Sequence, residues 1–300
     1  MKSFDYMRAG SIDEAVALLN APGLTSRALA GGTDLLVMVR AGEASFDRVV
    51  DISGIAEMRR IDLRGTRLNV GAAVTFAELM RHPLVLRHAR FLADAAQSVR
   101  TMQIENMATL GGNVANAAAA ADTPPVLVCL EAQAVIAGPG GRCGVPVADL
   151  LRGHLKSALP PGALICGFEF EVLPPGARSV FLKLGRRNAL TISRINIAAM
   201  GRTGDDGRAA EVRLVAGACF SRPRRAREVE ALLLGQLPSA ALFCAAGQEM
   251  ARLMVAETGR RWSTDYKSKA LAAMVEEALE AVLPPGAPAQ SAALVREKAG

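Results

Sequence analysis

Aromatic side chains are scarce in this sequence, which has one Trp, two Tyr and nine Phe among 300 residues. Proteins that hold unpaired bases stack them on exposed aromatic side chains, and carbohydrate platforms use similar surfaces. The scarcity therefore argues against both classes. The net charge of +6 is spread along the chain, and the densest basic cluster is Arg222, Arg224, Arg225 and Arg227. No nucleic-acid-binding motif accompanies this cluster, so we interpret it as a solvated face or a subunit contact.

Cysteines are few and lie far apart in the sequence. The five are Cys129, Cys143, Cys166, Cys219 and Cys244, and no two of them form a CxxC motif. Zinc ribbons and iron–sulfur clusters need closely spaced thiolates, so we predict neither kind of site on this chain. An odd number of isolated cysteines fits a reducing compartment. We therefore expect a cytoplasmic protein in which all five are buried as small apolar side chains.

Histidines and long apolar runs are also missing. His82, His88 and His154 are too dispersed to predict a metal site or a Ser-His-Asp or Cys-His catalytic centre. The longest apolar stretch, residues 114–138, is interrupted by charged residues and prolines and predicts no membrane span. Residues 1–19 carry charges on both sides of their apolar positions, which indicates a folded segment and not a signal peptide. What remains is a globular chain, 51% hydrophobic, with enough length for two or three domains.

The N-terminal residues alternate between strand and helix patterns. A Ser-Ile-Asp-Glu sequence is typical of a helix N-terminus and predicts a helix over residues 11–19. A strand is expected at 26–30, a helix at 35–40 that Gly42 ends, and a strand at 48–52. This alternation predicts a small α/β unit.

The rest of the chain changes from mixed to antiparallel patterns. Before residues 174–177, which we take as a domain boundary, strands are expected at 67–72, 132–137 and 164–172, and helices at 75–80, 83–99 and 126–131. After the boundary we expect strands at 179–184, 196–202 and 211–219 with a hairpin turn at 204–207, then helices at 226–234, 239–256 and 267–283.

Two Gly-Gly pairs precede expected helices, Gly31-Gly32 and Gly111-Gly112. A glycine pair between a strand and a helix lets backbone amides face outward, where a phosphate can approach without meeting a Cβ. Any tight strand-to-helix turn has the same appearance, but two such turns suit the two phosphoryl groups of a pyrophosphate. Neither pair has the lysine of a P-loop or the three-glycine spacing of the Rossmann fingerprint.

The residues around these pairs resemble a known family. Ala30-Gly31-Gly32-Thr33-Asp34-Leu35 and Thr109-Leu110-Gly111-Gly112-Asn113 look like the two FAD pyrophosphate motifs of the flavoprotein subunits of molybdenum hydroxylases. These are the medium subunits of bacterial xanthine and carbon monoxide dehydrogenases. The resemblance extends over nearly the whole chain, including Phe4-Asp5-Tyr6, Gln103-Ile104-Glu105-Asn106 and Phe181-Leu182-Lys183.

The resemblance implies an α+β fold. Two α/β subdomains, residues 1–56 and 57–176, would form a PCMH-type FAD-binding domain. A smaller C-terminal domain of antiparallel sheet and helices would follow at 177–285, with a flexible tail at 286–300.

It also implies which residues bind FAD. They are Ala30, Gly31, Gly32, Thr33, Asp34, Leu35, Thr109, Gly111, Gly112, Asn113, Asp122 and Lys183. Backbone amides of both motifs would hold the pyrophosphate, helped by Thr33 and Asn113. Asp122 would accept hydrogen bonds from the ribityl chain, and Lys183 would stabilise an anionic reduced flavin. No catalytic residue and no metal ligand is implied on this chain.

The sequence departs from the family pattern at three places. Glu105 stands where many relatives have a basic residue, alanines 117–121 replace a common proline, and Thr191 replaces an aspartate. Blander interpretations also stay open. Asp122 is a candidate N-cap of the next helix, Lys183 a candidate member of a solvated basic edge, and the alanines a tightly packed segment. Trp262 and Tyr266 are expected to be packing residues.

The function implied is that of an oxidoreductase subunit. It would pass electrons from iron–sulfur clusters through FAD to NAD⁺ or another acceptor. Molybdopterin would belong to a large partner subunit and the [2Fe–2S] clusters to a small one, because this chain has no evident molybdopterin site and no cysteine spacing for the clusters. The large subunit would choose the substrate. Two alternatives are a stand-alone FAD-dependent oxidoreductase of the same flavin fold and a non-catalytic structural subunit.

Overall fold

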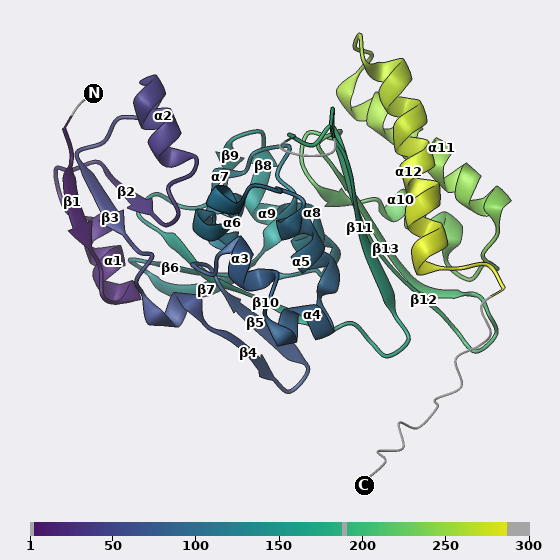
Figure 1. Ribbon diagram of the computed structural model, residues 1–300, viewed down its shortest axis with the longest axis horizontal. Coiled ribbons are helices and arrows are strands. Elements are labelled where there is room, and N and C mark those ends of the chain that lie inside the picture. The colour runs from purple at the N-terminus through teal and green to yellow at the C-terminus, as the bar shows by residue number, and fades with distance from the viewer. Residues whose placement is uncertain (1–2, 188–190, 287–300) are drawn as a thin grey trace, which may run out of the picture.

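The computed structural model of the protein describes residues 3–187 and 191–286. Three β-sheets follow one another along the longest axis of the molecule in the order of the sequence, and a layer of helices covers the last sheet (Figure 1). This is the expected α+β architecture. Apart from Gly286, the predicted tail lies outside the described residues.

The N-terminal unit is the predicted alternation of strands and helices. It consists of β1 (Asp5–Arg8), α1 (Ile12–Leu19), β2 (Ser26–Leu29), α2 (Leu35–Ala41) and β3 (Arg48–Asp51), with the three strands parallel in the order β1-β3-β2. Ser11 caps α1 by accepting a hydrogen bond from the Glu14 N–H, and Gly42 ends α2 in the left-handed conformation at φ 75°. Both helix ends were predicted from these local signals.

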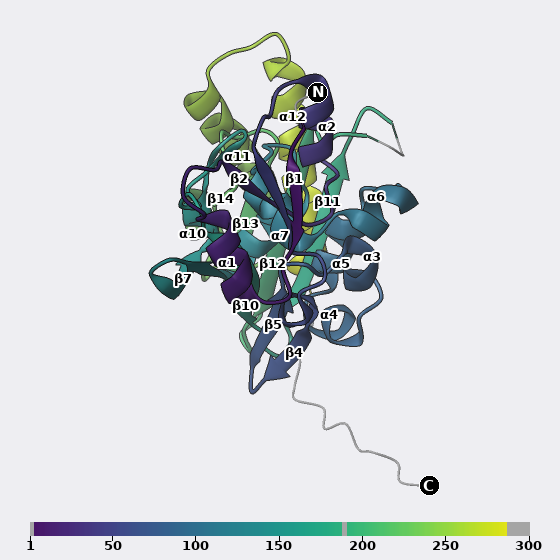
Figure 2. The ribbon, with the colours of Figure 1, turned by 90° about the vertical axis from the view of Figure 1, so that its left-hand side faces the viewer.

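The middle unit is built on an antiparallel five-stranded sheet. Its strands are β4 (Ile61–Arg64), β5 (Arg67–Gly71), β6 (Gln133–Gly138), β7 (Gly141–Pro146) and β10 (Leu164–Glu171), in the order β4-β5-β10-β6-β7. Its helices are η1 (Ala56–Arg59), α3 (Phe76–Leu79), α4 (Pro83–His88), α5 (Arg90–Gln97), α6 (Met102–Met107), α7 (Leu110–Asn116), α8 (Thr123–Cys129) and α9 (Val147–Leu150). A small hairpin, β8 (Leu151–Gly153) and β9 (Lys156–Ser157), follows α9. Helices α3 to α6 lie together on one side of this unit (Figure 2).

The single helix predicted over residues 83–99 is wrong, because the chain breaks it into α4 and α5 at Ala89. That residue is fully buried and has φ −149° and ψ 47°, outside the helical region. No glycine or proline stands at the break, so packing around Ala89 overrides the helical propensity of the sequence.

The C-terminal unit is an antiparallel sheet with helices on one face, as predicted (Figure 1). Its strands are β11 (Arg178–Leu184), β12 (Ile195–Thr203), β13 (Ala209–Gly217) and β14 (Arg224–Arg225) in that spatial order, and its helices are α10 (Arg227–Leu233), α11 (Ala240–Thr258) and α12 (Thr264–Val282). Helices α11 and α12 approach closely at Gly247, where a Cβ would lie 2.6 Å from the Ala272 carbonyl oxygen.

Strand β12 is the wall between two hydrophobic cores. Alternate residues, Ala198 and Met200, belong to the core shared with the first two units, whereas Ile197 and Ala199 belong to the core under α10–α12. Both faces of this strand are therefore buried, and successive side chains point to opposite cores. The sheet is thus packed on both sides, and the C-terminal unit is joined to the rest through a continuous apolar interface.

The sequence predictions for four side chains need correction. Cys143 is exposed on β7 and Cys244 is half-buried, so only Cys129, Cys166 and Cys219 are buried as expected. Trp262 is 86% exposed and Tyr266 is 51% exposed, so neither is a packing residue. Within the described residues, no helix has both the length and the apolar composition to cross a bilayer.

Candidate functional site

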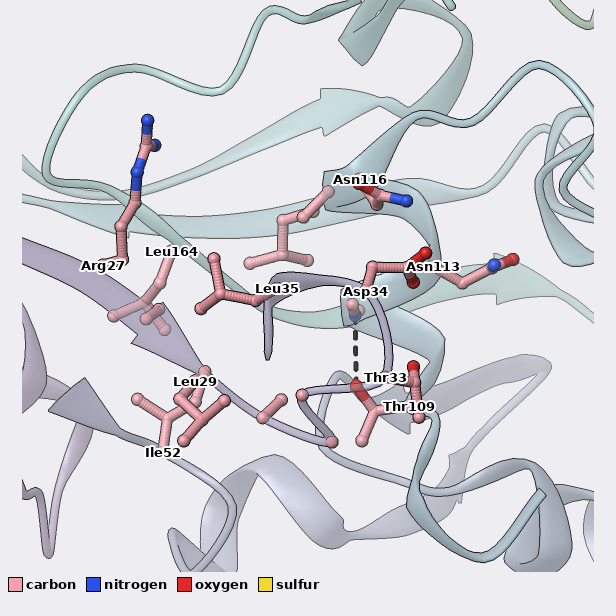
Figure 3. Close-up of a pocket in the computed structure, with 18 of the residues that line it drawn as sticks. Arg27, Leu29, Thr33, Asp34, Leu35, Ile52, Thr109, Asn113, Asn116 and Leu164 are labelled. Carbon is pink, nitrogen blue, oxygen red and sulfur yellow. Dashed lines mark hydrogen bonds between the residues drawn. The ribbon is translucent and has the colours of Figure 1, made fainter. Parts of the chain in front are cut away.

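A cavity of about 490 Å³ lies between the N-terminal unit and the middle unit (Figure 3). Its size is within the range of cofactor and ligand sites. Of the residues predicted to bind FAD, the lining includes Ala30, Gly31, Gly32, Thr33, Asp34, Leu35, Thr109, Gly111, Gly112 and Asn113. The fold therefore brings both glycine segments to one cavity, although they are far apart in the sequence.

The first glycine segment is the turn from β2 into α2, as predicted. Gly32 adopts φ 70°, a left-handed conformation that favours glycine. Within the described residues, the N–H groups of the five residues 31–35 have no hydrogen-bond acceptor. Unsatisfied amides at the start of a helix are the groups that bind phosphate in many proteins. This segment thus offers a run of donors to an anion in the cavity.

The second glycine segment differs from the prediction. Gly111 and Gly112 do not follow a strand but lie inside the first turn of α7, directly after α6 and the N-cap residue Thr109. Their N–H groups already have acceptors: Gly111 donates to the Ala72 carbonyl at 2.8 Å, and Gly112 to the Thr109 Oγ1 at 3.1 Å (Figure 3). The expectation of open amides at this segment is wrong. What α7 presents to the cavity is its small glycine surface and the side chains of Asn113 and Asn116.

Two of the glycines are required for close packing. A Cβ on Gly31 would lie 1.8 Å from the Met107 carbonyl oxygen, and a Cβ on Gly111 would lie 2.6 Å from the Ala72 Cβ. The first of these contacts brings the first glycine segment against the end of α6, because Met107 is the last residue of α6 and stands just before the second segment. A Cβ on Gly112, in contrast, would meet only the Thr109 Oγ1, at 3.0 Å. A side chain on Gly112 would therefore press on the hydroxyl that caps its own helix, but on no other group outside that helix within 4 Å.

The cavity has an apolar part and a polar part. Figure 3 shows Leu29, Ile52 and Leu164 together on one side and the polar groups of Thr33, Thr109 and Asn113 on the other. Charged residues in the lining are Arg27, Asp34 and Glu43. Desolvation by the surrounding protein raises the pKa of the Asp34 carboxyl above its ordinary value. The lining suits a ligand with both an apolar ring and a polar chain.

Asp122 and Lys183, the two other predicted residues, do not line this cavity. They form a buried ion pair, with the Lys183 Nζ 2.7 Å from the Asp122 Oδ2. Lys183 also donates to the Ser98 carbonyl at 3.1 Å. Asp122 occupies the N-cap position of α8, but its side chain makes no cap hydrogen bond, so the interpretation as an N-cap is wrong for the carboxylate.

Both oxygens of the Asp122 carboxylate accept hydrogen bonds from the protein. Oδ1 accepts from Ser193 at 2.6 Å and from Asn196 at 2.8 Å, and Oδ2 accepts from Lys183 at 2.7 Å. The Ser98 Oγ lies 3.1 Å from Oδ2, but its one proton has a shorter hydrogen bond to the Ala95 carbonyl at 2.7 Å. Burying a carboxylate is costly unless it is paired and hydrogen-bonded, and Lys183, Ser193 and Asn196 meet that requirement. The sequence contained no signal for Ser98, Ser193 or Asn196, because each lies more than twenty residues from Asp122 in the chain.

One hydrogen bond connects this network to the lining of the cavity. Thr123, which follows Asp122, donates from its Oγ1 to the Asn113 Oδ1 at 2.7 Å. The Asn113 side chain lies at the polar part of the cavity. Asp122 therefore does not line the cavity, but the next residue in the chain is hydrogen-bonded to a side chain that does.

The alanine-rich segment 115–121 is the end of α7 and a turn, and not an independent helix. Ala117 is left-handed at φ 50°, and its carbonyl accepts from the Leu155 N–H at 2.9 Å. The Ala119 N–H donates to the His154 Nδ1 at 3.2 Å. The β8–β9 hairpin thus holds this segment from the side, as the packing interpretation expects, and Leu155 also lines the cavity.

In the basic cluster at residues 222–227, Arg224, Arg225 and Arg227 form ion pairs within the chain, although the Arg227 side chain stays 65% exposed. Arg225 and Arg227 pair with Glu131 at the end of α8, at 2.6 Å and 2.9 Å, and Arg225 also pairs with the buried Glu230. The Arg213 guanidinium lies 3.6 Å from Glu131 as well. These ion pairs connect the C-terminal unit to the middle unit. Among the described residues, no group of His, Cys, Asp and Glu side chains is arranged to hold a metal ion.

Comparison with known proteins agrees with this geometry. Residues 2–170 match the family model of the FAD binding domain in molybdopterin dehydrogenase, and residues 180–282 match that of the CO dehydrogenase flavoprotein C-terminal domain. The xanthine dehydrogenase FAD-binding subunit of Escherichia coli O157:H7 is 34% identical over 227 residues, covering 75% of this chain and 77% of that protein. The carbon monoxide dehydrogenase medium chain of Hydrogenophaga pseudoflava is 27% identical over 278 residues, covering 93% and 96%.

The fold leads to the same relatives. A carbon monoxide dehydrogenase structure from Hydrogenophaga pseudoflava superimposes with a TM-score of 0.88 at 28% identity, covering 94% of this chain and 97% of that one. The two family models together account for both the cavity-forming units and the C-terminal sheet with its helices. This chain therefore belongs to the family of FAD-binding medium subunits of xanthine and carbon monoxide dehydrogenases, which are oxidoreductases of the molybdenum hydroxylase type.

Proposed function

We propose that the cavity between the two glycine segments holds FAD and that this chain is the flavoprotein of a multi-subunit molybdenum hydroxylase. When bound, FAD accepts electrons from iron–sulfur clusters of a partner subunit and delivers them to NAD⁺ or another acceptor. The observation that carries the proposal is the run of N–H groups at residues 31–35, which belong to the lining of a cavity of cofactor size and have no acceptor within the described residues.

The residues present fit this cofactor. The open amides of the first segment would bind the pyrophosphate, and the side chains of Thr33 and Asn113 would add polar contacts. Apart from the Thr109 Oγ1, no atom outside its own helix lies within 4 Å of a Cβ position on Gly112, which would leave room for the cofactor. The apolar part of the lining, with Leu29, Ile52 and Leu164, would accommodate an aromatic ring.

Asp122 and Lys183 are proposed to serve the flavin end of the cofactor. Both oxygens of the Asp122 carboxylate already accept hydrogen bonds from the protein. Its contribution would therefore be to hold Lys183 and the segment before α8 in position. A lysine ammonium has three donors, and the Asp122 and Ser98 oxygens accept two of them. The remaining N–H and the positive charge would stabilise negative charge on a nearby ring.

The other redox centres are proposed to belong to partner subunits. The five cysteines have no cluster spacing, and the described residues contain no metal-ligating group. We therefore assign the [2Fe–2S] clusters to a small subunit and molybdopterin, with the substrate site, to a large one. The five free cysteines also support a reducing, cytoplasmic location as part of this proposal.

The test is a titration of the purified full chain with FAD, followed by flavin absorption and fluorescence. The wild type should bind FAD, and Gly112→Val should lose it while the apoprotein still folds and unfolds cooperatively. Gly140→Val is the matched control, because a Cβ there meets nothing within 4 Å. Failure of the wild type to bind FAD would leave the non-catalytic structural subunit as the better description.

A second measurement separates the subunit from a stand-alone enzyme. The isolated chain loaded with FAD should transfer electrons only from an artificial or nicotinamide donor to a dye. Turnover of an organic substrate should require the two partner chains. Substrate turnover by the isolated chain would overturn the subunit proposal and favour a stand-alone oxidoreductase.

A further inference from the structure

The turn between α11 and α12 exposes an unusual group of large side chains. Trp262, the single tryptophan of the chain, is 86% exposed in this turn, and Tyr266 in the first turn of α12 is 51% exposed. Ile192, on the segment that leads into β12, is 78% exposed. Scattered surface hydrophobic residues are normal, but a group of large ones commonly marks an interaction site.

These side chains belong to one ordered surface. The guanidinium carbon of Arg194 lies 5.8 Å from the centre of the Tyr266 ring, which ties the segment of Ile192 to the start of α12. The turn itself is closed by two hydrogen bonds, from the Arg261 N–H to the Thr264 Oγ1 at 2.7 Å and from the Thr264 N–H to the Arg261 carbonyl at 2.9 Å. Trp262 is therefore presented by a fixed backbone. We call Ile192, Arg194, Arg260, Arg261, Trp262 and Tyr266 the hairpin-tip surface.

The hairpin-tip surface is basic. Arg194, Arg260 and Arg261 form no ion pair with any described carboxylate. In the 222–227 cluster, in contrast, Arg224, Arg225 and Arg227 are paired with Glu131, Glu228, Glu230 and Glu257. Asp265 is the one acidic residue within the same turn of sequence. Three arginines around an aromatic centre attract a partner whose contacting face carries carboxylates.

The composition favours a protein over a nucleic acid as the occupant. Trp, Tyr and Arg are the residues that dominate binding energy at protein interfaces, with an apolar centre and a charged rim. Nucleic-acid sites need a broader basic stripe or a row of stacking aromatics, and this surface has neither.

The surface and helix α2 lie on the same side of the molecule but far apart along it. In both views the α11–α12 turn and α2 rise above the sheets, and Figure 1 places them toward opposite ends of the longest axis. Helix α2 borders the cavity and exposes Leu36 at 40% and Val37 at 61%. A protein seated on the hairpin-tip surface would therefore contact the C-terminal unit and leave the rim of the cavity at α2 uncovered.

We propose that the hairpin-tip surface docks a partner subunit of the same complex, one that presents an acidic rim around an apolar pocket for Trp262. The inference rests on the proposed function, since it takes its partner from the multi-subunit assembly. It adds the location of the contact and the chemistry of the partner's face.

The test measures binding of the full, FAD-loaded chain to each purified partner subunit at low and high salt. Trp262→Ala should weaken the affinity by at least about tenfold, the size of an interface hot spot. The double variant Arg260→Glu with Arg261→Glu should weaken it further and flatten its salt dependence. Leu237→Ala is the matched control. Leu237 is also an exposed apolar residue, at 56%, but it lies outside the hairpin-tip surface, beside Gly207 in the β12–β13 turn.

The outcomes separate the two proposals. If the wild type binds a partner subunit and the variants bind it equally well, the docking proposal fails while the proposed function stands. If the wild type binds FAD but neither subunit, the assembly itself is overturned. Binding of duplex DNA, or self-association, that is lost in Trp262→Ala without any change in subunit affinity would reassign the surface and overturn the docking. Unchanged FAD affinity and melting temperature of Trp262→Ala show that an observed loss is local.

Discussion

Lys183 on β11 donates to Asp122, the residue directly before α8, across 2.7 Å in a nearly dry environment. The side chains are 11% and 7% exposed, so solvent screens the pair very little. Ser98 and Asn196 complete the network from the end of α5 and from β12. The pair therefore fixes the C-terminal sheet against the segment that leads from the cavity, at the place where we propose the flavin lies.

Replacing one member of this pair should cost more than replacing both. Lys183→Met leaves a buried carboxylate without its counter-charge, and we expect a loss of about 3–5 kcal/mol in the free energy of unfolding. Asp122→Asn combined with Lys183→Met should be destabilised by less than the sum of the single changes. Denaturant unfolding of the four proteins measures the coupling, and Lys269→Met, at an exposed position on α12, is the control. Additive losses would show that the pair is not coupled.

The ion pairs of Glu131 should make stability depend on pH. Partial burial by itself raises the pKa of Glu131, but the Arg225 hydrogen bond and the charges of Arg225, Arg213 and Arg227 lower it below the ordinary 4.5. A carboxyl whose pKa is lower in the folded state stabilises the protein above the ordinary pKa, and this contribution is lost as the pH falls through the folded value.

Glu131→Gln should therefore lower the free energy of unfolding near neutral pH by about 0.5–1 kcal/mol, a small figure because the side chain is half-exposed. The difference from the wild type should vanish below the folded pKa. Glu280→Gln, on the exposed face of α12 without an ion pair to a described residue, should show no such pH dependence. A loss of unfolding free energy in Glu131→Gln that is equal at acid and neutral pH would contradict the electrostatic explanation.

Gly31→Ala should damage the cavity through packing. The new Cβ would lie 1.8 Å from the Met107 carbonyl oxygen, so the two glycine segments must move apart. We expect a loss of at least about 2 kcal/mol in stability, the usual cost of overpacking, together with weaker FAD binding. The same substitution at Gly140 meets no atom within 4 Å and serves as the comparison. A melting temperature equal to that of the wild type would mean that the contact with Met107 is easily relaxed.

The five cysteines should differ sharply in reactivity. Burial raises the pKa of Cys129 and Cys219 to about 12 and that of Cys166 to about 11, so these thiols stay protonated and inaccessible. In the folded protein an alkylating reagent should modify Cys143 first and Cys244 more slowly, and all five should react after unfolding. Mass spectrometry of the peptides identifies the sites, and Cys143→Ser should remove the fast phase. Rapid modification of Cys129 in the native protein would refute the packing of α8.

The sequence predicted a helix end correctly where the residue that makes it contacts only backbone a few positions away. Ser11 at the start of α1 and Gly42 at the end of α2 are of this kind, because capping depends on short-range backbone geometry. The strand β1 was not predicted, since every one of its residues is exposed and it has no apolar alternation. It forms because its backbone pairs in parallel with β3, more than forty residues away.

The glycine segments show the same limit within the site. The sequence correctly pointed to Gly31-Gly32 as a strand-to-helix turn, but it suggested the same role for Gly111-Gly112. Only the structure shows that Ala72 on the neighbouring backbone and the Thr109 side chain accept the hydrogen bonds of the second pair. Likewise, the sequence does not show that Arg225 and Arg227 form ion pairs with Glu131, which lies more than ninety positions earlier in the chain.

Three features could be read from the amino-acid sequence alone: the lack of cysteine spacing for iron–sulfur clusters, the positions of the two glycine segments, and the family that these segments resemble. All three depend only on residue type and on short spacings along the chain. The tertiary structure decided which backbone amides remain open, which charges are paired and where the single tryptophan lies. Those properties depend on contacts between residues tens of positions apart, and a burial or a hydrogen-bond partner exists only after the chain has folded.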